Sequence, residues 1–402
     1  MVASKEYYTF DNFVKENKEL VGKEVSLNEN FEGSTGEASA DLQRIRDFTW
    51  ALGDDNPLFT DPAYAARTRY GCVIAPPTFP IVARYPGAHG KLWEGPWPAS
   101  TLFSGDELEC FDVIRVKDKI RSDLKYKDVF EKQGKRGRLL FFVTEGHFWN
   151  QHNELVGKQY GTQILVGMKT FEGMTQGKEI LYERGLHKYS PEEVERILSD
   201  IKAEARRGSE TLYWEDVNVG DKLTPVVKGP MHLGDMIAYY CGAVPMVRSF
   251  KLNLRDTLTH LGAQRLNPIT NWPYDNVQWE HNDFNLCKMR GLPGPFDLGI
   301  MRVEMASHVL TNWAGDDGFL RRMRIEIRKP NFYGDTTWFK GEVVKKYKVS
   351  EGDVEYGAVD LRIDVVNQIG EMTAPGTATV YLPSPGRDVV LPIPHKHVPP
   401  PR

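Results

Sequence analysis

The sequence predicts an α+β protein made of two similar units that lie side by side. Two observations support this prediction. Each half of the chain has a helix, a Gly/Pro turn, a long helix and then several strands, in the same order. In addition, only short local connections join the strands of each half, and such connections favour antiparallel pairing. We therefore expect two mostly antiparallel sheets, each packed on its long helix.

The helices are predicted from apolar spacing and from stop signals. Residues 40–52 have the pattern of a helix that ends at Gly53-Asp54-Asp55-Asn56-Pro57, and residues 233–242 match it in the second half. Residues 291–295, Gly-Leu-Pro-Gly-Pro, form a stiff turn before Gly299. After Gly299, apolar residues recur at the spacing of one helix face: Ile300, Val303, Ala306, Val309, Leu310 and Trp313. This stripe predicts a buried helix.

The strand-rich parts of the two halves share further landmarks. The turn at residues 150–154 matches residues 367–371, because both begin with Asn-Gln. We also match residues 102–107 with residues 331–336, since both contain an aromatic residue followed by Gly-Asp. The shared order indicates a tandem duplication, because a solenoid would need shorter repeats in more copies.

The duplication divides the chain into two units and two connecting segments. We expect a helical linker between the units, since Ser190 and Pro191 form a good helix start. A tail rich in proline follows the second unit and is expected to run along the surface. The predicted boundaries are residues 1–170 for the first unit, 171–210 for the linker, 211–382 for the second unit and 383–402 for the tail.

The composition is that of an ordinary soluble globular protein and excludes several function classes. The formal net charge of −4 gives no reason to expect nucleic acid or an acidic membrane surface as a partner. The four cysteines are scattered without a C-x-x-C spacing, so we expect neither a structural zinc site nor a redox pair. No signal peptide or membrane-spanning run is recognisable, which predicts a cytoplasmic protein.

A polar stretch before the Gly/Pro turn brings acid, amide and imidazole groups together. Its members are Asp275, Asn276, Glu280, His281 and Asp283. The free N–H groups at the start of the following helix carry partial positive charge. A loop histidine aimed at that terminus could move a proton while the N–H groups hold a developing oxyanion. Taken alone, however, a loop histidine is more often a surface or hydrogen-bonding residue.

These features together resemble the MaoC family, the double-hot-dog hydratases and dehydratases of acyl-CoA. The first half resembles the fatty-acid-synthase-like dehydratase domain found at the N-terminus of such chains. The family signature is D-x-N-P-x-H-x-D, followed by a Gly/Pro turn and a buried helix. The resemblance implies a tandem hot-dog fold, in which each half is an antiparallel sheet wrapped around a long central helix. It also implies an acyl-CoA thioester substrate, no cofactor and no metal.

In the first half the signature is incomplete. Residues 54–61, Asp-Asp-Asn-Pro-Leu-Phe-Thr-Asp, keep the acid Asp54 and Asn56, but Phe59 stands where the histidine would be. An aromatic ring cannot carry a proton, so the resemblance implies that this half is not catalytic. Asp54, Asn56 and Phe59 are then expected to shape the substrate groove.

The second half keeps the imidazole of the signature. His281-Asn282-Asp283 fits H-x-D, and Gly299 stands at the helix start, where the family's backbone N–H binds the thioester oxyanion. Counting back without a gap puts Asn276 at the acid position, with Asp275 one residue further. The resemblance therefore implies that His281 and Gly299 are catalytic, together with Asp275 or Asn276. It implies that Asp283 and Gly294 contact the substrate.

An insertion at residues 243–274 has no counterpart in the first half. It interleaves leucines with arginine and lysine residues, so it either lines the acyl channel or forms a surface excursion. We hold these two interpretations equal.

Three functions remain open at this point. The first is hydration of a 2-enoyl-CoA, or dehydration of a 3-hydroxyacyl-CoA, in the second half. The second is a non-catalytic subunit that binds acyl thioesters and needs a partner, which Phe59 and Asn276 favour. A hot-dog thioesterase is the third. A Ser-His-Asp hydrolase is disfavoured further, because the sequence contains no G-x-S-x-G elbow. The resemblance also leads us to expect a homo-oligomer, such as a homodimer.

Overall fold

The computed structural model describes most of the chain. The described residues are 9–26, 35–88, 100–134, 137–166, 184–243, 250–251, 270–271, 279–289 and 292–400. Asp275 and Asn276, and most of the 243–274 insertion, lie outside them. The choice between Asp275 and Asn276 and the role of the insertion therefore fall outside the described residues.

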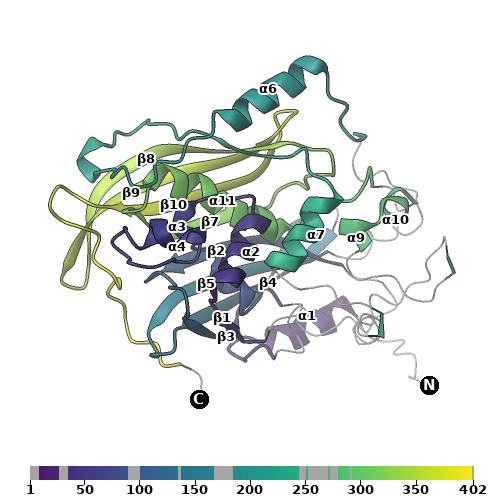
Figure 1. The fold of residues 1–402 in the computed structure, drawn as a ribbon. Coiled ribbons are helices and arrows are strands. Elements are labelled where there is room, and N and C mark those ends of the chain that lie inside the picture. Colours follow the sequence, from purple (N-terminus) through teal and green to yellow (C-terminus); the bar gives the residue numbers. More distant parts are fainter. Residues whose placement is uncertain are drawn as a thin grey trace.

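The described strands form one antiparallel ten-stranded sheet (Figure 1). Its order is β1-β3-β4-β5-β2-β7-β10-β9-β8-β6, so the two halves follow the same internal order and meet where β2 pairs with β7. This symmetry is that of two hot-dog units joined edge to edge and confirms the predicted fold class. The strands are β1 (Glu37–Ser39), β2 (Ser100–Cys110), β3 (Lys119–Gly134), β4 (Gly137–Trp149), β5 (Leu155–Val166), β6 (Val226–Lys228), β7 (Phe319–Glu326), β8 (Thr337–Glu351), β9 (Val354–Asn367) and β10 (Met372–Leu382).

Helices from both halves pack together over this sheet. Helices α2 (Leu42–Ala51) and α7 (Leu233–Gly242) lie side by side, and a Cβ on Gly242 would come within 2.3 Å of the Asp47 carbonyl oxygen (Figure 1). Glycine is therefore required at this crossing. Other described helices are α1 (Phe10–Lys18), α3 (Pro57–Thr60), α4 (Pro62–Ala65), α6 (Pro191–Lys202), α9 (Trp279–Asn282), α10 (Phe284–Met289) and the 3-10 helices η1 (Phe79–Val82) and η2 (Trp214–Asp216). None of the described helices is long and apolar enough to span a membrane.

The central helices of the two halves differ. In the second half, α11 (Gly299–Ala314) starts at the predicted glycine and is buried along most of its length. In the first half, the place after Pro76-Pro77 holds only the four-residue η1 among the described residues, and residues 89–99 lie outside them. A full-length central helix, expected in both halves, is thus seen in the second half. Proline within η1 explains this in part, because proline breaks the backbone hydrogen bonds of a longer helix.

The two Asn-Gln turns are built alike. The Asn150 side-chain oxygen accepts the N–H groups two and four residues ahead, at 2.9 and 3.1 Å. The Asn367 oxygen does the same at 3.2 and 3.0 Å. Each asparagine also donates its amide to the glutamate that closes the turn, at 2.8 Å in the first half and 3.0 Å in the second. The turns are therefore equivalent parts of the two halves.

One predicted match between the halves was wrong. Residues 331–336 form the loop before β8, whereas residues 102–107 lie inside β2. The true counterpart of these residues is 114–119, at the start of β3. Asp118 and Asp335 show this, since each accepts the N–H three residues before it at 2.8 Å and the side-chain amide of the turn glutamine. A shared Gly-Asp pair misled the sequence comparison, because hydrogen bonds between distant segments define the equivalence.

If the two turns are equivalent, they should contribute equally to the unfolding free energy. Replacing Asn150 or Asn367 with Ala removes the acceptor of two turn N–H groups. At about 0.5–1.5 kcal/mol for each hydrogen bond, each variant should lose about 1–3 kcal/mol of unfolding free energy. Urea denaturation of the two variants measures both losses. A large loss from one and none from the other would contradict the equivalence.

The tail does more than run along the surface. Val389 and Ile393 are buried in a cluster with Phe111 and Trp149 of the first half. The Ile393 N–H donates to the Phe111 carbonyl at 2.6 Å, and the Trp149 indole donates to the Val398 carbonyl at 3.1 Å. The end of the chain therefore ties the second half back to the first. The high proline content of the tail predicted a surface segment and gave no indication that these apolar residues are buried.

Candidate active site

His281 lies in α9, buried against the segment that leads into α11. Its Nδ1 is 2.8 Å from the Phe296 carbonyl oxygen, which fixes the tautomer that carries hydrogen on Nδ1. Its Nε2 therefore holds a lone pair. Burial lowers the pKa of the imidazole, although nearby Glu280 opposes this. The ring is thus neutral at physiological pH and able to accept a proton.

A carboxylate lies beside this lone pair. The Glu280 Oε1 atom is 3.7 Å from His281 Nε2. This separation exceeds a direct hydrogen bond and fits a water held between the two groups. Sequence reasoning named Glu280 in the polar stretch but did not give it the acid's place, because counting in register pointed to Asp275 or Asn276.

His281 is tied to the start of the central helix. Phe296, its hydrogen-bond acceptor, precedes Gly299, the first residue of α11, by three positions. The N-cap residue Leu298 offers no side-chain cap to the helix. A Cβ on Gly299 would lie 2.9 Å from the Phe103 ring of the first half, so the backbone approaches β2 closely here. The backbone oxygen that His281 contacts therefore lies three residues before the uncapped start of α11. The catalytic roles expected for His281 and Gly299 stay predictions.

A buried ion pair holds this helix start in position. The Arg302 guanidinium makes two bonds to Asp297, at 2.7 and 2.6 Å, and donates to the Lys329 carbonyl at 2.6 Å. Both side chains are almost fully buried. The pair therefore connects the first turns of α11 to the turn before it.

Two tyrosines complete the surroundings of His281. The Tyr333 hydroxyl donates to the His281 carbonyl at 2.5 Å. The Tyr240 hydroxyl, from α7, interacts with the Asn282 side chain and lies close to Glu280. Both hydroxyls keep their protons, since burial raises the pKa of Tyr240 and of Tyr333. The two tyrosines therefore line the surroundings of His281 and form hydrogen bonds rather than act as bases.

Two residues expected to contact substrate have structural contacts. The Asp283 carboxylate accepts the N–H groups of Asn285 and Leu286 at 2.9 Å each and so caps α10. Gly294 lies in the turn before α11, where an added Cβ would come within 3.2 Å of Leu186. Their predicted contact with substrate stays a prediction.

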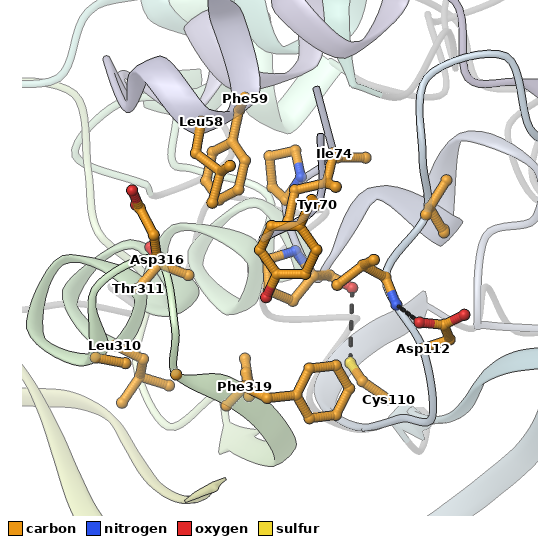
Figure 2. Close-up of a pocket in the computed structure, with 18 of the residues that line it drawn as sticks. Leu58, Phe59, Tyr70, Ile74, Cys110, Asp112, Leu310, Thr311, Asp316 and Phe319 are labelled. Carbon is orange, nitrogen blue, oxygen red and sulfur yellow. Dashed lines mark hydrogen bonds between the residues drawn. The ribbon is translucent and has the colours of Figure 1, made fainter. Parts of the chain in front are cut away.

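The first-half signature lies beside an apolar pocket between the halves (Figure 2). Leu58 and Phe59 of α3 form one wall, and Leu310 and Thr311 of α11 form another (Figure 2). The Phe59 side chain is 2% exposed, and Asn56 caps α3 by accepting the Leu58 N–H at 3.0 Å. This half thus offers an apolar groove without a histidine in the signature position.

Comparison with known proteins agrees with this architecture. A family model described as the FAS1-like dehydratase domain region matches residues 30–159. A UPF0336 protein of Thermobifida fusca is 40% identical over 119 residues, which are 27% of this chain and 72% of that protein. Another, from Parafrankia sp., is 38% identical over 153 residues, which are 36% of this chain and 97% of that protein. The chain belongs to the UPF0336 family.

Solved structures extend the likeness to both halves of this UPF0336 chain. A MaoC-like dehydratase is 16% identical, with a TM-score of 0.58, over 88% of this chain and 98% of that one. A putative MaoC domain protein dehydratase from Chloroflexus aurantiacus is 12% identical, with a TM-score of 0.52, over 87% of this chain and 94% of that one. The UPF0336 chain therefore has the fold of the MaoC-like dehydratases.

Asp54 of the UPF0336 chain has partners that sequence reasoning missed. Its Oδ1 lies 3.4 Å from Nε2 of His308, a buried residue of α11. The Lys228 ammonium lies 2.8 Å from His308 Nδ1 and donates to the Gly53 carbonyl at 2.7 Å. The only available signal was a histidine within an apolar helix stripe, which usually means a buried histidine rather than a site.

Asp54, Asp55 and His308 have ligand atoms within 4.8 Å of one another, as a metal site requires. The Lys228 ammonium already lies against His308 and provides positive charge there. The group therefore fits a buried polar contact between the halves better than a metal site.

Stability should depend on pH through Asp54. Burial raises the pKa of this carboxyl to about 6, well above its usual value near 3.8. Because the folded state holds the proton more tightly, the contribution of Asp54 is most favourable below about pH 4 and is lost as pH rises through about 6. The unfolding free energy of wild type minus that of Asp54→Asn should therefore fall over this window. A difference that stays flat from pH 4 to 7 in denaturant titrations would refute the shift.

Proposed function

We propose that the second half hydrates a 2-enoyl-CoA thioester, and dehydrates the corresponding 3-hydroxyacyl-CoA, by acid-base catalysis. The observation that supports this most strongly is the position of His281. Its neutral imidazole is buried, holds a lone pair on Nε2 and is hydrogen-bonded to the turn that begins α11.

The proposed step needs only groups of this chain. A water between His281 Nε2 and Glu280 Oε1 gives its proton to the imidazole as its oxygen bonds to C3 of the enoyl group. The electrons of the double bond move toward the thioester carbonyl, and amide groups at the start of α11 stabilise the resulting oxyanion. The imidazolium then returns the proton to C2, and the net change is addition of one water. Asp275 or Asn276 would share the task of holding that water.

The test is a screen of purified protein against 2-enoyl-CoA thioesters of increasing chain length. Loss of the enoyl absorbance, and formation of the 3-hydroxyacyl product, are the expected results. Release of free CoA without hydration would support a thioesterase instead.

A second candidate is a non-catalytic subunit that binds acyl thioesters. The apolar pocket beside Phe59 favours it, as does the match of the family model to the half without the histidine. Saturable binding of acyl-CoA with no turnover, restored by a partner chain, would establish this role.

A further inference from the structure

A group of buried polar side chains lies where the two halves meet on the inner face of the sheet. We call it the polar cluster, and its members are Asp106 of β2, Gln159 and Gln163 of β5, Tyr239 of α7 and Glu304 of α11. All five are at least 96% buried. Nonetheless, Asp106 Oδ1, both glutamine oxygens, both Glu304 carboxyl oxygens and the Tyr239 hydroxyl have no hydrogen-bond partner.

The members of the polar cluster face one another. The Gln159 amide donates to Asp106 Oδ2, and the Asp106 and Glu304 carboxyls interact electrostatically. The Tyr239 hydroxyl approaches the Glu304 carboxyl without completing a hydrogen bond. Gln163 donates to Tyr85, whose ring lies near both acids. The unpartnered atoms therefore converge from both halves on one place.

Such a cluster indicates that something else binds there. Each buried polar atom without a partner costs about 1–3 kcal/mol, so packing alone does not account for six of them in one place. Five of the six unpartnered atoms are amide or carboxyl oxygens, and a protonated carboxyl carries only one O–H. A group that donates hydrogen bonds would therefore satisfy oxygens that the cluster itself leaves unpaired. Burial also raises the pKa of Asp106 to about 7 and that of Glu304 well above its usual value. A nearly neutral cluster favours a neutral donor over a cation.

The polar cluster lies within reach of the proposed catalytic site. Glu304 follows Gly299 by five residues, which is about 7.5 Å along α11. On the other side, Phe103 contacts the Gly299 position, and its ring lies 6.0 Å from that of Tyr85. Tyr239 of the cluster is the chain neighbour of Tyr240, which lies close to Glu280. The cluster therefore lies near the start of α11, where the thioester is proposed to bind.

We propose that the polar cluster binds a hydroxyl group carried by the acyl chain, beyond the carbons that react. The preferred substrate is then a hydroxylated acyl thioester rather than a plain hydrocarbon one. This inference rests on the proposed function for the position of the thioester, and its own content is the recognition of the hydroxyl group.

The test compares saturated acyl-CoA thioesters of equal length, with and without a hydroxyl on successive carbons of the chain. Isothermal titration should show about tenfold tighter binding for at least one hydroxylated member, the effect of one buried hydrogen bond. Glu304→Leu should abolish this preference without lowering the melting temperature, because it removes unpartnered acceptors. Met305→Leu, on the same helix outside the cluster, is the matched control and should keep the preference.

Several results would overturn the inference. They are equal binding of all members, tighter binding of an amine-bearing analogue, or an unchanged preference in Glu304→Leu. Equal binding is also the result expected if buried water alone satisfies the cluster. If Glu304→Leu does not fold, Gln163→Leu provides the same comparison.

Saturated ligands keep the two proposals distinguishable, since they bind without reacting. A hydroxyl preference in a protein that hydrates no enoyl-CoA would retain the subsite and refute the hydratase. Hydration of enoyl-CoA substrates, with equal affinity for hydroxylated and plain chains, would retain the hydratase and refute the hydroxyl subsite.

Discussion

Replacing His281 with Ala is expected to lower kcat/KM for enoyl-CoA hydration by about 100- to 10,000-fold, the usual contribution of a positioned acid-base group. The imidazole supplies the lone pair that takes the proton from water. Binding of a saturated acyl-CoA should change little, because the effect falls on the transition state. Stopped-flow or steady-state absorbance assays measure the loss.

The controls for this experiment come from the same molecule. Phe59→Leu changes the signature position of the first half and should keep turnover, while losing about 0.5–3 kcal/mol of stability. Equal loss of turnover from His281→Ala and Phe59→Leu would indicate two working sites and contradict the assignment. Urea denaturation of His281→Ala must also show a folded protein, because its absent ring leaves the Phe296 carbonyl without a partner.

The pH profile gives an independent check of His281. Burial lowers the pKa of its imidazole below the ordinary value of 6.5, so the active neutral form predominates at pH 7. The acid limb of kcat/KM should therefore lie below pH 6.5. An acid limb centred above pH 7 would exclude this residue as the base.

Breaking the Asp297–Arg302 pair is expected to have the largest effect on stability. Asp297→Ala leaves the Arg302 guanidinium buried without its carboxylate, and Arg302→Met leaves the Asp297 carboxylate buried without its guanidinium. Each variant should therefore lose about 3–5 kcal/mol of unfolding free energy. The double variant should cost clearly less than the sum, because it removes both buried charges. Denaturant titration of all four proteins completes the cycle.

The same variants test how the helix start contributes to function. If the pair positions the first turns of α11, the double variant should fold but lose turnover, because Gly299 is no longer held against Phe103 and the imidazole. If the stability losses of the two single variants simply add in the double variant, the two residues do not stabilise each other. If the double variant also keeps full activity, the pair does not position the active site.

Much of the fold could be predicted from local patterns. The stripe from Ile300 to Trp313 predicted the central helix with its correct start at Gly299, and the Asn-Gln turns marked the duplication. These features follow from helix periodicity and turn chemistry, which act within a few residues. The match of residues 102–107 with 331–336 failed for the opposite reason, since it depended on which distant segments share hydrogen bonds.

The site shows the same division. The sequence by itself determined that the first half lacks the signature histidine, at Phe59, and that the second keeps His281 before a glycine-initiated helix. Only the tertiary structure decided that Glu280 faces the imidazole, that Asp54 meets His308 across the halves, and that Glu304 faces Asp106. These contacts arise because β2 pairs with β7 and α11 packs beneath both, and the chain's local periodicity carries no information about that pairing.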